Sequence, residues 1–225
     1  MLQTFGKSVV NFLNSLHIPE EIEGVKVINP YKDEEVQRVV DVFYNRYFND
    51  NQDRTFIIGI NPGRLGGGLT GISFTDPIAL KDYCDIENNC GDKRELSSRF
   101  IYRMIEAFGG VKDFYYKFYL TALFPLALTK DNKNYNYYDN SSLQTKLEKE
   151  MIQSLVTQTA FGANRKNAIC LGKKNYKIIE KLNSHYHFFD HLHVVEHPRY
   201  IMQYKLKQIE HYIDQYLQVM AECRK

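Results

Sequence analysis

The sequence predicts an α/β fold, a three-layer α/β/α sandwich around a central four-stranded, mostly parallel sheet. Two observations carry this prediction. Four short apolar segments have the length and composition of buried strands, and segments with apolar residues at helical spacing separate them. Strands that alternate with helices in this way form a mostly parallel sheet with helices on both faces. The expected strands are residues 55–60, 117–123, 167–171 and 192–196.

The first 54 residues are expected to form two helices. Apolar side chains recur at helical spacing between Thr4 and Leu16, and Pro19 ends that helix. Acidic residues 33–35 begin a second helix that ends near Asn49, because negative charges suit the positive end of the helix dipole. A chain of 225 residues is long enough for one sizeable core. We therefore expect a single domain, residues 1–225, in which residues 1–54 pack on a core of residues 55–220.

The helices after the first strand are recognised by their start and stop signals. Asp76 followed by Pro77 is a favourable N-cap and first helical residue. Ser97 or Ser98 could cap the next helix, which a pair of glycines at 109 and 110 stops. The expected helices are residues 77–83, 97–108, 141–161, 173–182 and 201–220. Residues 84–93 and 130–140 are polar and are expected to be irregular.

Composition, charge and cysteines narrow the class of protein. Charged residues make up 25% and hydrophobic residues 44% of the chain, which is ordinary for a soluble globular protein. The net charge of +2 is too small to establish nucleic-acid binding, but a local basic face would suffice. The four cysteines contain no C-x-x-C pair, so we expect no metal site, and reduced thiols point to the cytoplasm. No apolar run is long enough to span a membrane, and we expect a monomer.

A glycine-rich loop, residues 59–77, follows the first strand and is the strongest functional signal. Five of the 13 glycines lie in its 63–77 part, and glycine lets the backbone come close to a ligand. Pro62 stiffens the turn directly after Asn61. Asn61 is therefore expected at the carboxyl end of a central strand, which is where open α/β sheets bind ligands.

A second polar loop, His197-Pro198-Arg199, follows the last strand. Because the carboxyl ends of parallel strands lie at one edge of a sheet, both loops should open on the same side. Asn61 and His197 are then expected to face one pocket, although 136 positions separate them (197 − 61).

These two loops give the chain its resemblance to a known family. The first reads Gly-Ile-Asn-Pro-Gly over residues 59–63, and Thr70-Gly71 and Phe74 follow Asn61 at the spacing that the family shows. With His-Pro-Arg at 197–199, the chain resembles the uracil-DNA glycosylase superfamily and, within it, the single-strand-selective monofunctional (SMUG-type) branch. Residues 197–204, HPRYIMQY, resemble a bacterial subgroup.

The resemblance implies a uracil-DNA glycosylase-like fold and a monofunctional hydrolase for base excision repair. Such an enzyme cleaves the N-glycosidic bond of uracil, or of a related deaminated or oxidised base, in single- or double-stranded DNA, without metal or cofactor. Asn61 would orient a water for attack on C1′, and His197 would donate a hydrogen bond to the base O2. The base-binding set is Gly59, Ile60, Gly63, Gly71, Phe74, Thr121, Ala122 and Asn136. The DNA-contacting set is Gly66, Gly67, Gly68, Lys173, Pro198, Arg199 and Tyr200.

Two departures from the family pattern concern substrate choice. The family reads the uracil edge with an Asn three residues before the proline after the second strand. Counting back from Pro125 gives Ala122 instead, and Thr121, Asn134 and Asn136 are the alternatives. The animal enzymes read His-Pro-Ser-Pro-Arg where this chain reads His-Pro-Arg, so the element that wedges into DNA should differ.

Other interpretations stay open. The fold could be a non-catalytic nucleic-acid-binding module, or an enzyme that hydrolyses free nucleosides. Five histidines fall between 185 and 197, but without Cys or acidic partners at ligand spacing, surface or hydrogen-bonded core histidines are favoured over a metal site. Tyrosines at 135, 137 and 138 could stack on unpaired bases or pack over their own loop.

Overall fold

The central sheet has the predicted architecture. The computed structural model describes residues 3–224. Four strands form the sheet in the order β4-β3-β7-β8, and every neighbouring pair is parallel. They are β3 (Arg54–Gly59), β4 (Phe118–Ala122), β7 (Ala163–Leu171) and β8 (His191–Val195). The prediction of an α/β sandwich with a four-stranded parallel sheet is confirmed.

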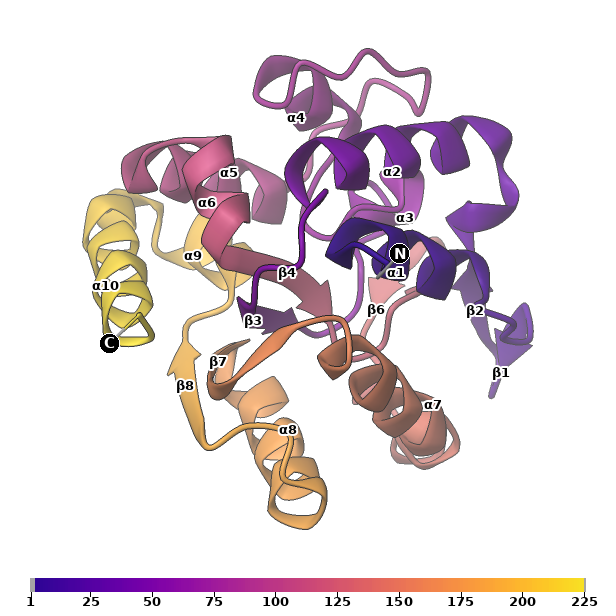
Figure 1. Ribbon diagram of the computed structural model, residues 1–225. Helices are drawn as coiled ribbons and strands as arrows, with labels where there is room; N and C mark the ends of the chain where they lie inside the picture. Colours follow the sequence, from indigo (N-terminus) through magenta and orange to yellow (C-terminus); the bar gives the residue numbers. More distant parts are fainter. Residues whose placement is uncertain (1–2, 225) are drawn as a thin grey trace.

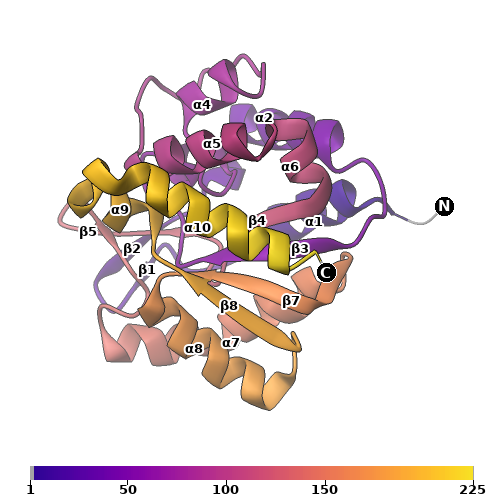
Figure 2. The same cartoon turned by 90° about the vertical axis from the view of Figure 1, so that its left-hand side faces the viewer.

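Helices cover both faces of this sheet (Figures 1 and 2). On one face lie α7 (Ser141–Thr159) and α8 (Lys173–Tyr186), which both contact β7. On the other face lie α5 (Leu96–Phe108), α6 (Val111–Lys117) and α10 (Ile209–Glu222). All six residues of β3 are buried, as expected for a strand covered on both faces. Because helices cover both faces of the sheet, its edges are the part that is open to a ligand.

The first two helices, α1 (Phe5–Asn14) and α2 (Glu34–Tyr47), pack together near the start of β3. Phe5 lies among the rings of Phe48 and Tyr119. The fully buried Arg54 places its guanidinium over Phe5 and Phe48, 4.8 and 4.6 Å from the ring centroids, and pairs with Asp50. A buried arginine is stable only with such partners, so this cluster fixes where β3 enters the sheet.

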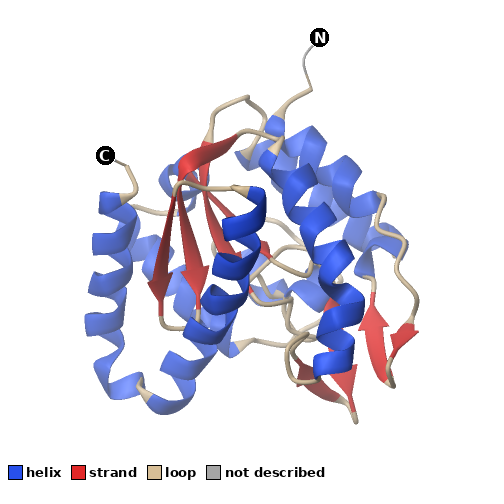
Figure 3. Cartoon of the chain, turned by 90° about the horizontal axis from the view of Figure 1, so that it is seen from below, coloured by secondary structure: helices blue, strands red, loops and turns tan. Residues whose placement is uncertain are grey.

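A second, antiparallel sheet was not predicted. It has the order β1-β2-β5-β6 and stands apart from the first group of strands (Figure 3). Its strands are β1 (Glu21–Ile22), β2 (Val25–Ile28), β5 (Ala127–Lys130) and β6 (Lys133–Tyr135). Asp131 and Asn132 join β5 to β6 with φ of 51° and 57°, the left-handed pair that a two-residue hairpin turn requires. The expectation that residues 130–140 are irregular is therefore wrong over the hairpin.

Three helix predictions also need correction. Helix α6 was missed, because residues 111–117 adjoin the glycine pair without a cap signal. The expected closing helix is two helices, α9 (Pro198–Tyr204) and α10, separated by a 3-10 turn, η2 (Leu206–Gln208). Helix α5 is preceded by Glu95, not capped by Ser97 or Ser98; the Ser98 hydroxyl instead accepts a hydrogen bond from the Asp76 N–H.

The remaining elements are short. They are η1 (Pro30–Lys32), α3 (Gly67–Thr70) and α4 (Pro77–Asp82), and the Asp76 carboxylate caps α4 as predicted. Strand β7 begins four residues before the predicted start, because Ala163 pairs with Arg54 ahead of a register shift. No helix within residues 3–224 is long and apolar enough to cross a membrane.

Candidate active site

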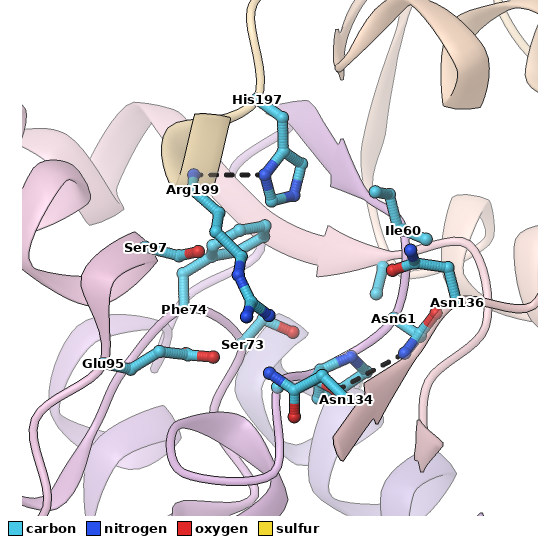
Figure 4. Close-up of a pocket in the computed structure, with 13 residues that line it drawn as sticks. Ile60, Asn61, Ser73, Phe74, Glu95, Ser97, Asn134, Asn136, His197 and Arg199 are labelled. Atoms are coloured by element: carbon cyan, nitrogen blue, oxygen red, sulfur yellow. Dashed lines mark hydrogen bonds between the residues drawn. The ribbon is translucent and has the colours of Figure 1, made fainter. Parts of the chain in front are cut away.

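A pocket opens at the carboxyl edge of the central sheet. Strands β3, β4 and β8 end at Gly59, Ala122 and Val195, and the chain then continues into the predicted loops. The cavity measures about 40 Å³. Thirteen residues line it (Figure 4): Ile60, Asn61, Pro62, Gly63, Ser73, Phe74, Glu95, Ser97, Ala122, Asn134, Asn136, His197 and Arg199. The structure thus brings Asn61 and His197 into one pocket.

Both ends of the Asn61 amide are hydrogen-bonded to the backbone at the end of β6 and just after it. Its Nδ2 donates to the Tyr135 carbonyl at 3.0 Å, and its Oδ1 accepts from the Tyr137 N–H at 3.2 Å. These two bonds fix which end of the amide is oxygen. An amide oxygen has two lone pairs, so Oδ1 keeps one for a further donor such as a water.

Phe74 forms one wall of the pocket and has an unusual backbone. Its φ is +57°, a left-handed conformation that costs energy for a residue other than glycine. The Phe74 ring lies over Gly59, where an added Cβ would come 2.5 Å from Cζ. The centroid of the ring lies 6.1 Å from that of His197. The loop thus holds an aromatic face beside the imidazole at the cost of local strain.

His197 is a neutral hydrogen-bond donor in this pocket. Its Nδ1 accepts a hydrogen bond from the Arg199 N–H at 3.2 Å, which caps α9. The ring proton therefore resides on Nε2. Burial, with a smaller contribution from the Arg199 charge, lowers the pKa of His197 to about 4. At neutral pH the imidazole is uncharged and can donate only through Nε2.

Glu95 lines the pocket although no sequence motif pointed to it. Its backbone N–H donates to the Asp76 carboxylate at 2.8 Å. Its carboxyl occupies the space that side chains at Gly63 and Gly66 would need, since added Cβ atoms would lie 1.7 and 2.0 Å from its oxygens. Burial raises the pKa of Glu95 to about 7; Arg199 opposes this shift and Asp76 adds to it. The spacing of those two glycines is the one sequence signal that could have indicated a neighbouring group.

Some of the predicted base-binding residues line the pocket and others do not. Ile60, Gly63, Phe74, Ala122 and Asn136 line the pocket, whereas Gly59 lies beneath Phe74. Gly71 turns at φ +73° against Tyr31, and Thr121 is buried with its hydroxyl bonded to Gln158 at 2.6 Å. Thr121 is therefore not an alternative reader of the base edge, because the strand directs its side chain away from the pocket.

Some of the predicted DNA-contacting residues are exposed and others are buried. Arg199 and Tyr200 are exposed at the start of α9, and Lys173 is exposed but pairs with Glu196 at 2.8 Å. Pro198 is buried. Gly66, Gly67 and Gly68 are also buried, and added Cβ atoms at 67 and 68 would lie about 3 Å from backbone oxygens. The structure places these three glycines in the close packing of the loop, and their contact with DNA stays a prediction.

The other predicted histidine positions do not assemble a metal site. His193 bonds to Asn167 at 3.0 Å, and His191 is exposed. Within residues 3–224, no three His, Cys, Asp or Glu side chains come close enough together to hold a metal ion.

An amide, a neutral imidazole and an aromatic face meet at the carboxyl edge of the parallel sheet, and the comparisons assign the chain to the DNA glycosylase class of hydrolases. The chain belongs to the uracil-DNA glycosylase superfamily: the sequence model described as "Uracil DNA glycosylase superfamily" matches residues 46–221. The chain is also similar to the crystal structure of wild-type SMUG2 from Pedobacter heparinus, with 40% identity over 99% of both chains and a TM-score of 0.94. A comparison with curated protein sequences gave no match. The resemblance inferred from the two loops is confirmed.

Proposed function

We propose that this protein removes uracil, or a related deaminated or oxidised base, from DNA by hydrolysing its N-glycosidic bond. One observation carries the proposal: Asn61 and the neutral, Nε2-protonated His197 line the same cavity, with the Phe74 ring beside them. A base inside a duplex cannot reach such a pocket, so the target nucleotide must flip out of the stack.

His197 acts on the leaving base. The flipped base stacks on Phe74 with its O2 toward Nε2 of His197. As the C1′–N bond breaks, its electron pair leaves with the base, and negative charge develops on O2. A fixed donor that meets this charge stabilises the transition state without reorganising. A neutral imidazole suits this role, since its Nδ1 is already satisfied by the Arg199 N–H.

Asn61 acts on the water. Its Oδ1 orients a water molecule toward C1′, and the water oxygen forms the new bond to C1′ as the base departs. The water loses its proton to solvent, and the base anion takes one up from solvent. An amide is a poor base, so its contribution is orientation. Among the described residues that line the pocket there is no lysine, so we propose simple hydrolysis without a Schiff base.

The base edge is read by Asn134 of β6 and Asn136 directly after it, and not from β4. Asn134 accepts the Arg64 N–H with its Oδ1 at 3.0 Å, which leaves its Nδ2 to donate. Asn136 donates its Nδ2 to Asp139 at 3.0 Å, which leaves its Oδ1 to accept. One free donor and one free acceptor match the O4 and N3–H of uracil. Together the two amides replace the single one that is missing at Ala122.

The test is base excision from labelled single-strand oligonucleotides that carry uracil, hydroxymethyluracil, hypoxanthine or xanthine, followed by alkali. Strand breakage at the modified position is the expected result. No breakage with any of the four bases would refute the proposal. Binding of these oligonucleotides without breakage would indicate a non-catalytic module, and hydrolysis of free deoxyuridine alone would indicate a nucleoside hydrolase.

A further inference from the structure

The pocket contains two formal charges that the hydrolysis scheme leaves unused. Glu95 and Arg199 are the acidic and basic residues among its thirteen lining residues. Within the described part of the chain, neither side chain forms a hydrogen bond or an ion pair. Charged groups that face a small cavity without partners are candidates for a role in charge stabilisation.

Arg199 lines the same pocket as His197, Asn61 and Phe74. It lies in the first turn of α9, two residues after His197, and Figure 4 shows its side chain extending past His197 toward Glu95, Ser73 and Asn134. Its charge lowers the pKa of both His197 and Glu95. A cation whose field reaches the His197 ring also reaches an oxygen that is hydrogen-bonded to that ring.

Glu95 lines the same pocket as Arg199 and carries the opposite charge when it is ionised. Its carboxyl packs against Gly63 and Gly66 of the first loop. The charged groups that face it are Arg199, from the start of α9, and Asp76, from the cap of α4. Burial is the largest influence on its pKa, which lies near neutrality. Both the ionised and the neutral carboxyl are therefore populated at physiological pH.

The cavity is also small enough to make these charges matter. At about 40 Å³ it holds only a few water molecules, since one needs about 10–15 Å³. A base that enters must displace this water and share the space with the Arg199 side chain. Because Arg199 is exposed, water screens its charge in the empty pocket, and an entering base removes part of that screening.

We propose that the Arg199 guanidinium stabilises the departing base anion together with His197, and that Glu95 weakens this effect when it is ionised. The inference rests on the proposed function, because it needs a base that leaves as an anion. His197 contributes only a dipole, whereas Arg199 contributes a full positive charge and cannot give up its proton. Arg199 and Glu95 together carry a charge of +1 when Glu95 is neutral and no net charge when Glu95 is ionised.

The first test separates charge stabilisation from DNA binding. Single-turnover excision is measured at saturating enzyme on single-strand DNA with uracil or 5-fluorouracil, whose ring is more acidic and leaves more easily. Arg199→Gln should slow uracil excision about 10²-fold and 5-fluorouracil excision much less, while Arg199→Lys retains part of the rate. Arg99→Gln, at an exposed position of α5 outside the pocket, is the matched control and should keep the wild-type rate.

Two outcomes would overturn this role of Arg199. One is an equal loss with both bases. The other is weaker DNA binding with an unchanged single-turnover rate, which would assign Arg199 to the phosphates alone. Wild-type protein that fails to excise any base would instead refute the proposed function itself, so the two failures are distinguishable.

The second test addresses Glu95. The wild-type rate should rise as pH falls from about 8 to about 6, because Glu95 becomes neutral while His197, with a pKa near 4, stays uncharged. Glu95→Gln should be fast and independent of pH over this range. A wild-type rate that falls with decreasing pH would show that the carboxylate assists the reaction, and the role assigned to Glu95 would be wrong.

Discussion

The backbone N–H of Arg199 donates to Nδ1 of His197 at 3.2 Å, so one residue sets the tautomer of the imidazole two positions before it. The same interaction begins α9, since His197 is the N-cap of that helix. The proton on Nε2 is thus a consequence of where the helix begins. A helix start that shifted by one residue would leave the imidazole free to carry its proton on either nitrogen.

Removing the imidazole should abolish stabilisation of the base anion. We expect His197→Ala to lower single-turnover uracil excision by about 10²–10³-fold, the usual loss for one such donor. DNA affinity, measured by fluorescence anisotropy, should change only slightly. His197→Gln, which keeps an N–H donor, should recover part of the rate. An unchanged rate in His197→Ala would place the base away from this residue.

Asn61→Asp should behave differently from Asn61→Ala. Both should slow excision, but aspartate also places a carboxylate oxygen where Nδ2 now donates to the Tyr135 carbonyl at 3.0 Å. Two acceptors in contact leave a partly buried group unsatisfied, which costs about 1–3 kcal/mol. We therefore expect Asn61→Asp to be less stable than Asn61→Ala in urea unfolding. Equal stabilities would contradict the role of this hydrogen bond.

The hairpin amides should set which base is accepted. We expect Asn134→Ala and Asn136→Ala each to reduce kcat/KM for uracil by about 10-fold or more, since each leaves a polar edge of the base unpaired. Asn132→Gly is a suitable control, because Asn132 has φ +57° in the hairpin turn and glycine adopts that conformation freely. Wild-type kinetics in both alanine variants would assign base recognition elsewhere.

Glu95 should also make stability depend on pH. Its pKa is raised to about 7 in the folded protein from an ordinary value of 4.5. The carboxyl therefore favours the folded state below about pH 4.5, and this contribution is lost as pH rises toward 7. We expect Glu95→Gln to gain stability relative to wild type at pH 8, on the order of 2 kcal/mol, and to gain less at pH 4. The same difference at both pH values in urea unfolding would refute this.

The strands and the two site loops could be predicted because their signals are local. The apolar run of β3 and the glycines after Asn61 each reveal a structure within a few residues. The β5–β6 hairpin was hidden, because residues 130–140 are polar and β5 is a strand through its pairing with β6 and with the distant β2. Glu95 was hidden for a related reason: it reaches the pocket through packing on Gly63 and Gly66, more than 25 positions away (95 − 66 = 29).

The burial of some predicted site residues also has a physical explanation. Glycine runs permit close approach, but the sequence does not say what approaches. Gly67 packs against the backbone of Ile72, and Gly68 packs against the backbone of Gly63, both in the same loop. Thr121 precedes Ala122, which holds the family position and lines the pocket. Alternate residues of a strand face opposite sides, so the Thr121 hydroxyl points to Gln158.

Asn134 lies in the same short segment as Tyr135 and Tyr137. The backbone groups of these two tyrosines form hydrogen bonds with the Asn61 amide. Substrate choice and water placement are thus built on one short piece of chain. A mutation that reshapes this piece to admit another base will also tilt the amide that aims the water. New base preferences in this protein should therefore arise with a slower reaction at first, and recover speed only through compensating changes around Asn61.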